Sequence, residues 1–480
     1  MNLIWNKNIQ LFEKRFPQLC ELIADHISFF KKFAGTDDEI NLYPFWKISE
    51  SKIHTPIAEE NGLRLHSAYN PIRESDSFIT SQSDKISEKE SIVFLGMGLG
   101  YPVISACEKF QKKTIIIIEP DINHFLAALL LMDFEKVFSH TNIIIALSST
   151  PEQTLTLINQ YSVENSIFIS MNAHQTHNKA YFDIVTELIE RNRKKEQINS
   201  ATLKKFGKLW HKNCSKNITV AKTLNGVITQ KNKFKGKPFL LVAAGPSLET
   251  LLPYLPELKK RMIIVCVDTA LKACLRAKTE PDFIVLTDPQ YWAYRHIAGL
   301  KSPSSVLVTE LAAYPAVFRF ECKKILLCNS QVPMAKDYSL EEKGDLGAGG
   351  SVASSAFNLC VLCGASEIYA IGLDLSFPFR QTHIKGSTFE ENVHTVSSRI
   401  KTAETSSMPM LFSGNACLST DYNNKPVLTD QKMKMFAWWF ESRIAELPYI
   451  KTLTLAPQGL KIPGIKPSTT DYLMTLIKFR

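Results

Sequence analysis

The chain repeats one pattern, in which a short apolar strand runs into a glycine turn, a helical stretch, and a second apolar strand that ends in an acid. In both copies the first glycine and the acid lie 23 residues apart, at positions 96 and 119 and at positions 245 and 268. Strand, glycine turn and helix in this order are typical of Rossmann folds. The sequence therefore predicts an α/β protein with two Rossmann-like, doubly wound units. The copies begin at Ser91-Ile-Val-Phe-Leu95 with Gly96-Met-Gly98-Leu-Gly100, and at Pro238–Ala244 with Gly245-Pro-Ser247.

Apolar runs continue to alternate with helical stretches after Asp268, which predicts one parallel sheet in the second unit. Further strands are expected at Pro281–Pro289, Ser305–Thr309, Lys324–Cys328, Glu367–Ile371 and Lys451–Leu455, and helices at Ala270–Ala277, Val352–Cys363 and Lys432–Arg443. We expect a Rossmann-like domain over residues 1–185, a helical connector over 186–235 and a catalytic domain over 236–480. Residues 1–85 read as helices and loops, with Asn41–Trp46 and Ser75–Lys89 as irregular segments.

Composition excludes several classes of protein. Hydrophobic residues make up 45% of the 480-residue chain and charged residues 21%, which is ordinary globular usage. The longest apolar runs, such as Phe125–Met132, are shorter than the roughly 18 residues of a membrane span, and the first twenty residues hold no signal-peptide core. Ten cysteines without a disulfide framework suit a reducing compartment. We expect a cytoplasmic protein that does not engage a membrane.

Positive charge is concentrated between Arg191 and Lys237, where 14 Lys or Arg residues face one acid, Glu196. The chain as a whole carries +9, so the remainder is net acidic. A solvated helical connector is the favoured interpretation, and an anion-binding or acidic-partner surface is the alternative. Aromatic residues are sparse in this segment, so a stacking platform for nucleic acid is not indicated.

Two glycine turns are candidates for holding phosphate. Gly245, Pro246 and Ser247 follow a predicted strand, and a second turn of Gly349, Gly350 and Ser351 opens a predicted helix. Backbone N–H groups at such places, together with the positive helix end, can hold a nucleotide or diphosphate. The alternative is a tight turn with a capping serine.

Three aspartates end predicted strands, namely Asp268, Asp288 and Asp374, and Thr269 follows the first of them. Carboxyl ends of parallel strands share one edge of the sheet, so these acids should face one crevice, where they could bind sugar hydroxyls or act as a base. Helix capping is the competing role. No metal ligand set is expected, because D-x-D is absent and Cys360-Val-Leu-Cys363 lies within an apolar helix without a partner pair.

His383 follows Asp374 on what reads as a loop beyond a strand end, where a general base could lie, and His394 lies eleven residues further on. For each of them an ordinary surface histidine is the favoured interpretation. In the first unit, the glycines of Gly96-Met-Gly98-Leu-Gly100 with Glu119 resemble a nucleotide fingerprint. Their alternative role is to shape a turn in a scaffold that binds nothing.

At this level of detail the chain resembles a known family, the motility-associated factor proteins, which are proposed to glycosylate flagellin. The first unit contributes Ile92–Tyr101 and Ile115–Asp121 to this resemblance. The second contributes AAGPSLE (Ala243–Glu249), IIVCVDTALK (Ile263–Lys272), PDFIVLTDP (Pro281–Pro289), GGSVASSAFNLCVLCG (Gly349–Gly364) and IGLDLSF (Ile371–Phe377).

The resemblance implies a transferase that moves a nonulosonic acid, of the pseudaminic or legionaminic type, from a CMP-sugar onto Ser or Thr of flagellin and so supports motility. Both glycine turns would then bind the CMP phosphate, Asp268, Thr269 and Asp288 would line nucleotide and sugar, and Asp374 and His383 would orient or deprotonate the acceptor. No cofactor or metal would be required, because helix N-termini could stabilise the departing phosphate.

The same core is similar to bacterial sialyltransferases and to archaeal-type 6-hydroxymethylpterin diphosphokinases. The sialyltransferases carry a late general-base histidine, whereas the roughly equivalent stretch here, Pro426–Lys432, offers only Thr429 and Asp430, so His383 is the first candidate base. A kinase-like function would use ATP and Mg²⁺. A flagellin-binding protein without activity is the third alternative.

Overall fold

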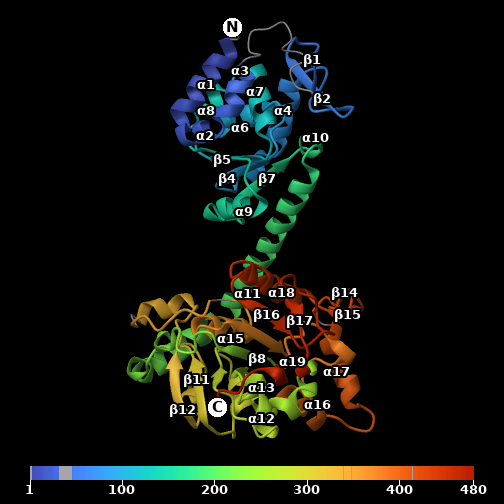
Figure 1. Cartoon of the computed structure of the whole chain (residues 1–480). Coiled ribbons are helices and arrows are strands. Elements are labelled where there is room, and N and C mark those ends of the chain that lie inside the picture. Colours follow the sequence, from blue (N-terminus) through green and yellow to red (C-terminus); the bar gives the residue numbers. More distant parts are fainter. Residues whose placement is uncertain (1–2, 32–45, 339, 348, 413) are drawn as a thin grey trace. The chain divides into compact units, whose positions relative to one another are not determined.

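The computed structural model describes residues 3–31, 46–338, 340–347, 349–412 and 414–480. The chain divides into two compact units, Met1–Ser200 and Ala201–Arg480. Each unit holds its own parallel sheet (Figure 1). The predicted fold class, two Rossmann-like doubly wound units, is confirmed.

The sheet of unit 1 has four parallel strands in the order β6-β5-β4-β7. These are β4 (Ser91–Leu95), β5 (Thr114–Glu119), β6 (Ile143–Leu147) and β7 (Ser166–Ser170). Alternate residues of one strand enter two different cores: Ile92 and Phe94 pack on one face of the sheet, Val93 and Leu95 on the other. Burial on both faces explains why these strands read as unbroken apolar runs. Strand order reverses between β4 and β7.

Helices surround this sheet, and a small antiparallel sheet precedes it (Figure 1). The helices are α1 (Leu3–Arg15), α2 (Pro17–Leu22), α3 (Ala24–Lys31), α4 (Pro71–Ser81), α5 (Ser83–Ser87), α6 (Tyr101–Lys109), α7 (Ile122–Leu131), α8 (Glu135–Phe138), α9 (Pro151–Gln160) and α10 (Asn172–Gln175). The small sheet comprises β1 (Trp46–Glu50), β2 (Pro56–Glu60) and β3 (Leu63–Arg64).

Two expectations for the first 89 residues are wrong. The small sheet was not expected, because its strands are short and only partly apolar. The segment Ser75–Lys89, expected to be irregular, contains the end of α4 and all of α5. Asn70 caps α4 by accepting the Arg73 N–H at 2.8 Å, which offsets the polar composition of that helix. Of the segment Asn41–Trp46, only Trp46 lies within the described residues.

The basic segment forms most of one 45-residue helix, α11 (Lys179–Thr223), and the division between the units falls within it. In the part belonging to unit 2, buried residues recur at helical spacing as Asn213, Asn217 and Ala221, while Lys212 and Lys216 are exposed. The helix is therefore amphipathic there, with polar amides on its buried face. The domain boundaries at 185 and 235 stay predictions.

The sheet of unit 2 has eight parallel strands in the order β12-β11-β10-β9-β8-β13-β16-β17. They are β8 (Pro238–Val242), β9 (Ile263–Val267), β10 (Phe283–Val285), β11 (Ser302–Thr309), β12 (Cys322–Leu327), β13 (Glu367–Ile371), β16 (Lys451–Thr454) and β17 (Lys466–Pro467). The chain moves outward from β8 to β12 and then returns to β13, on the other side of β8. Strand order therefore reverses between β8 and β13, which is where ligands bind in such sheets.

Helices and short 3-10 turns connect these strands, and an antiparallel hairpin, β14 (Cys417–Thr420) and β15 (Pro426–Thr429), follows β13. The connecting elements are η2 (Val227–Gln230), η3 (Pro246–Thr250), η4 (Leu252–Tyr254), α12 (Leu255–Leu258), α13 (Asp268–Arg276), α14 (Tyr291–Ile297), η5 (Pro315–Arg319), η6 (Pro333–Tyr338), α15 (Val352–Leu362), η7 (Pro378–Arg380), α16 (Thr388–Thr395), α17 (Ala403–Phe412), α18 (Gln431–Ala445) and α19 (Thr470–Thr475). Cys360 and Cys363 are buried, so core packing of this pair is confirmed. No helix in the described part of the chain has the length and apolar character to cross a bilayer.

Candidate functional site

The switch point of unit 2 is closed by direct contacts between residues that the sequence predicts for the site. The Ser247 N–H donates to Asp374 Oδ2 at 3.0 Å, and Ser247 Oγ accepts the Gly372 N–H at 3.0 Å. The Gly245 N–H donates to the Gly372 carbonyl at 2.8 Å. A Cβ on residue 245 would lie 2.1 Å from Asp374 Oδ2, so only glycine fits there. The ends of β8 and β13 thus form one interlocked edge.

This arrangement bears on phosphate binding by the first glycine turn. The turn enters a short 3-10 segment, η3, rather than the start of a long helix. The amides of Gly245 and Ser247 are both paired within the protein, and Pro246 has no N–H. To hold a phosphate, the Ser247 N–H would have to exchange Asp374 for the ligand. Phosphate binding by these three residues stays a prediction.

Asp374 is the most unusual carboxylate at this edge. It is 2% exposed, and among the described residues its Oδ1 has no hydrogen-bond partner. Burial raises the pKa of Asp374, and the hydrogen bonds from Ser247 lower it. A buried carboxylate oxygen without a donor is costly, because the water that it lost is not replaced. A ligand hydroxyl or ammonium group would relieve that cost.

Three more acids follow adjacent strands: Asp268 after β9, Asp288 after β10 and Glu310 after β11. Asp268 and Glu310 are buried and Asp288 is half-buried. Burial, together with the charge of Asp288, raises the pKa of Asp268 to about 7 and that of Glu310 to about 7. Burial also raises the pKa of Asp288, against the Gln290 N–H and Lys432, which lower it. We call these three residues the acid row.

Local hydrogen bonds fix the acid row. Thr269 Oγ1 donates to Asp268 Oδ1 at 3.3 Å, and the Gln290 N–H donates to Asp288 Oδ1 at 2.8 Å. From α11, Asn213 Nδ2 donates to the carbonyls of Pro289 and Ala312, both at 2.9 Å. Those carbonyls belong to the loops that follow β10 and β11. The amides on the buried face of α11 therefore hold the loops that carry Asp288 and Glu310.

The second glycine turn opens α15 and faces α18. Ser351 caps α15, its Oγ accepting the Ala353 N–H at 3.3 Å, as the alternative interpretation expected. Gly350 has φ +74°, and a Cβ there would lie 3.0 Å from Phe436 of α18. Gly349 is equally close-packed, since its Cβ would lie 2.8 Å from the Trp439 ring. Lys432, in the first turn of α18, supplies positive charge to this region, and nucleotide binding by the turn stays a prediction.

His383 lies on a loop attached to the end of β8, where the Ile384 N–H donates to the Ala244 carbonyl at 2.8 Å. The ring is half-buried and stacks on Phe389 with centroids 4.2 Å apart. Burial, together with the charge of His296, lowers the pKa of His383 to about 4. His383 is therefore neutral at pH 7 and able to accept a proton. Its contact with substrate stays a prediction.

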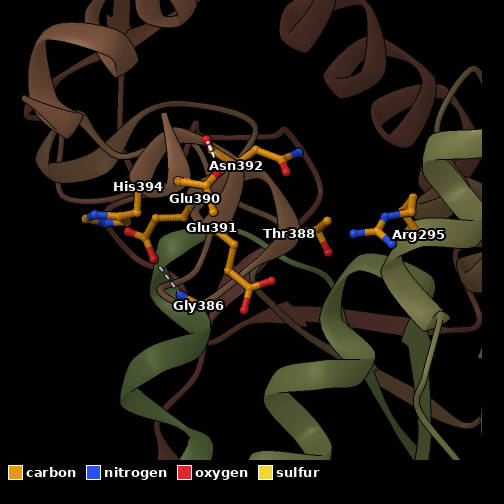
Figure 2. Close-up of a pocket in the computed structure, with 8 residues that line it drawn as sticks. Arg295, Gly386, Thr388, Glu390, Glu391, Asn392 and His394 are labelled. Atoms are coloured by element: carbon orange, nitrogen blue, oxygen red, sulfur yellow. Dashed lines mark hydrogen bonds between the residues drawn. The ribbon is translucent and has the colours of Figure 1, made fainter. Parts of the chain in front are cut away.

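A pocket lies beside this loop (Figure 2). Its lining residues are Arg295, Gly386, Thr388, Glu390, Glu391, Asn392, His394 and Thr395. The Gly386 N–H donates to Glu390, and Glu391 pairs with Lys272 of α13. Of the two histidines that the sequence analysis considered, this pocket holds His394 rather than His383. None of the predicted site residues lines it, so we place the candidate site at the sheet edge.

In unit 1 the glycine loop after β4 is filled by the protein's own groups. The Met97 N–H donates to Glu119 Oε2 at 3.3 Å, and the Leu99 N–H donates to His66 Nε2 at 3.1 Å. A Cβ on Gly98 would lie 2.7 Å from His174 Nε2. The amides that would face a nucleotide are already paired. This packing favours the scaffold interpretation of the loop.

Part of each unit is similar to a known family model. Residues 25–196 match the family model described as the glycosyltransferase Maf N-terminal domain, and residues 212–379 match the 6-hydroxymethylpterin diphosphokinase MptE-like model. Residues 25–196 are thus similar to the N-terminal domain of Maf glycosyltransferases. A solved structure, the Maf glycosyltransferase from Magnetospirillum magneticum AMB-1, is similar to this chain with a TM-score of 0.64. The match covers 100% of this chain and 76% of the chain in that structure. At 13% identity that likeness concerns the fold.

Relatives in Treponema pallidum carry no stated function. One uncharacterized protein is 35% identical over 233 residues, which cover 42% of this chain and 59% of the relative. A second is 27% identical over 261 residues, covering 53% of this chain and 85% of the relative. The likeness to Maf glycosyltransferases therefore rests on the N-terminal family model and on the fold.

Three residues of the site were not singled out in the sequence. Glu310 directly follows an expected strand, as the predicted aspartates do, so the same signal could have found it. Lys432 and Asn213 offer no such signal, because each is one polar residue among several on its helix. Only the packing of α18 and α11 shows what they face.

Proposed function

We propose that this chain transfers a nonulosonic acid, of the pseudaminic or legionaminic type, from a CMP-sugar to Ser or Thr hydroxyls of flagellin in the cytoplasm, in support of flagellum assembly. The likeness of residues 25–196 to the Maf N-terminal domain supports this proposal. The observation that carries it is the gathering of buried carboxylates at the carboxyl edge of one Rossmann sheet, beside its switch point. Such an edge suits a nucleotide-sugar.

The proposed roles follow from position and charge. Asp268 and Asp288 bind hydroxyls of ribose or sugar. Lys432 and the N-terminus of α15 attract the CMP phosphate, because both present positive charge. These cations stabilise the phosphate as it departs, so no metal ion is required in this scheme.

The reaction forms a bond between the acceptor oxygen and the anomeric carbon of the sugar and breaks the bond from that carbon to the phosphate oxygen. The acceptor proton passes to a base of the protein, and CMP leaves with the electron pair. His383 is the first candidate base because it is neutral at pH 7. Asp374, with one oxygen lacking a donor, orients the acceptor hydroxyl.

The test is transfer itself. Purified protein is incubated with unmodified flagellin and CMP-pseudaminic or CMP-legionaminic acid, and the intact mass of flagellin is measured. We expect mass to increase by whole sugar residues with at least one donor. Asp374→Asn should slow transfer at least tenfold, whereas Asp471→Asn, on an exposed position of α19, should not. No mass increase with either donor would contradict the proposal.

The MptE-like match supports a second candidate, pyrophosphoryl transfer from ATP to a hydroxymethylpterin. In that case the acid row would hold Mg²⁺ instead of a sugar. Thermal stabilisation distinguishes the two, because a ligand raises the melting temperature of the state that binds it. A magnesium-independent shift with CMP supports the glycosyltransferase, and a magnesium-dependent shift with ATP supports the kinase. No shift, with flagellin binding unaffected by Ser247→Ala or Gly350→Ala, would favour a non-catalytic flagellin-binding protein.

A further inference from the structure

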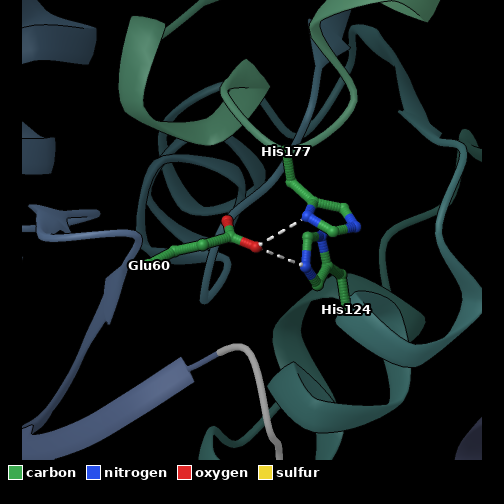
Figure 3. Close-up of side chains that lie close together, drawn as sticks. All are labelled: Glu60, His124 and His177. Carbon is green, nitrogen blue, oxygen red and sulfur yellow. Dashed lines mark hydrogen bonds and ion pairs between the residues drawn. The ribbon is translucent and has the colours of Figure 1, made fainter.

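Three side chains from separate segments of unit 1 converge on one point (Figure 3). Glu60 ends β2, His124 lies in α7, and His177 lies between α10 and α11. His124 Nε2 and His177 Nδ1 each lie 3.2 Å from the same Glu60 oxygen, Oε1. We propose that these residues bind a divalent transition-metal ion of the zinc type. This site is far in sequence from the acid row and independent of the proposed transfer reaction.

The spacing of the three atoms suits a tetrahedral zinc ion. Zinc binds histidine nitrogen and carboxylate oxygen at about 2.0–2.2 Å, so neighbouring ligand atoms lie roughly 3.3 Å apart. Both nitrogen-to-oxygen distances here are 3.2 Å, close to that value. All three atoms lie within 4.8 Å of one another, so a small rotation of the imidazole rings brings the third pair to the same spacing.

The second ring nitrogen of each histidine, the one that does not contact Glu60, lies near another carboxylate. His124 Nδ1 lies 3.9 Å from Glu119 Oε1, and His177 Nε2 lies 3.5 Å from Asp121 Oδ2. Metal-binding histidines commonly use the second nitrogen in this way, because a carboxylate there fixes the ring and strengthens the bond to the metal. The His124 ring also stacks on Trp46, with centroids 4.8 Å apart. The arrangement thus supplies both the ligands and the groups that orient them.

The charges around the three ligands also favour a bound cation. Glu60, Glu119 and Asp121 place three carboxyl groups around two imidazoles, and Glu60 and His124 are buried. A dication would balance this excess of acid, because buried charges are normally paired or bound to a metal. The His177 side chain is 29% exposed, which leaves room for water or another ligand at a fourth position. Glu119 also accepts the Met97 N–H, so the site is linked to the glycine loop after β4.

The experiment uses the full chain, freed of metal by a chelator and then incubated with Zn²⁺ and desalted. We expect one zinc per chain by elemental analysis, a higher melting temperature with zinc, and a tetrahedral visible spectrum with Co²⁺. Glu60→Gln and His177→Ala should lose the metal. His26→Ala, which removes an exposed histidine of α3, is the matched control and should retain it.

Substitution of a carboxylate that lies next to a ligand histidine gives a second measurement. Asp121→Asn should weaken zinc binding about 10-fold to 100-fold, as is typical of residues that orient metal-binding histidines. The proposal is overturned if the wild-type chain retains no stoichiometric zinc, or if Glu60→Gln and His177→Ala bind as the wild type does. The cluster is then only a set of ion pairs. If a variant fails to fold, wild-type stoichiometry and the Co²⁺ spectrum still decide.

Discussion

At the scale of single residues, two carboxyl groups of the acid row are only partly ionised at neutral pH. With a pKa of about 7 each, Asp268 and Glu310 are close to half-protonated at neutral pH. Asp288 lies on the strand between them and repels both. Groups of this kind can exchange a proton with a substrate at the working pH, so they are typical of functional sites.

The raised pKa of Asp268 makes unit 2 sensitive to pH. In the unfolded chain this carboxyl loses its proton near pH 4, but in the folded chain only near pH 7. Its contribution to stability is thus complete below pH 4 and is lost as the pH rises to about 7. At about 1.4 kcal/mol per pKa unit, a shift of about three units amounts to roughly 4 kcal/mol. Asp268→Asn should reduce this loss of stability with rising pH, as measured by the melting temperature of unit 2 at pH 5 and pH 8. Equal slopes for both proteins would contradict the assignment.

His383→Ala should lower kcat about 10²-fold to 10⁴-fold, the usual contribution of a general base. The KM for the CMP-sugar should change little, because the proposed role concerns the acceptor proton. Since the pKa of His383 is about 4, the rate of the wild-type enzyme should show no inflection from this residue near pH 6.5. Steady-state kinetics across pH 5–8 test this, with His54→Ala as an exposed control. Unchanged turnover would exclude His383 as the base.

At this scale one local signal was enough to single out Asp268, Asp288 and Asp374, because each follows an apolar run, and their roles in a site stay predictions. The zinc-type cluster could not be found in this way, because 64 residues separate Glu60 from His124 and a further 53 separate His124 from His177. No spacing rule connects them, and only the fold brings them together.

At the scale of elements, the pair β8 and β13 has the least tolerance for change. A Cβ on Gly245 would meet Asp374 Oδ2 at 2.1 Å and the Gly372 carbonyl at 2.5 Å. A Cβ on Gly372 would in turn meet the Ala243 carbonyl at 2.1 Å. The two strand ends approach so closely that glycine is required on both.

Gly245→Ala should therefore separate the ends of β8 and β13 and cost about 3 kcal/mol or more. For a unit of this size the melting temperature should fall by roughly 5 °C or more, measured by the loss of circular dichroism on heating. Gly299→Ala is the matched control, because that glycine has φ +76° but open space around it, and it should cost only about 1 kcal/mol. Equal losses for both variants would argue against the close approach.

Strands and helices were predicted well where the spacing of apolar residues and the positions of the glycines indicate the same boundaries. The strands β4, β8 and β13 and the helix α15 lie within a residue or two of their predicted bounds. The small sheet at β1–β3 and the hairpin β14–β15 were missed, because their strands are short and only partly apolar. Antiparallel strands of this kind lack the continuous apolar run that marks a buried parallel strand.

At the scale of the whole chain, the units have separate hydrophobic cores. The core of unit 2 and those of unit 1 contain different residues throughout. Each unit should therefore respond to its own ligand. We expect calorimetry to resolve two transitions, one raised by CMP and the other by Zn²⁺. A single transition that both ligands raise equally would show that the units unfold together.

The interlocked edge of unit 2 also provides a way to observe binding without following the reaction. The amides of Gly245, Ser247 and Gly372 are all paired in the free protein, so their hydrogens should exchange with deuterated solvent slowly. A ligand that accepts a hydrogen bond from the Ser247 N–H would replace Asp374 as the acceptor. Between the two hydrogen bonds this N–H is briefly unpaired, and its hydrogen can then exchange. The deuterium uptake of this turn thus reports how readily the site opens.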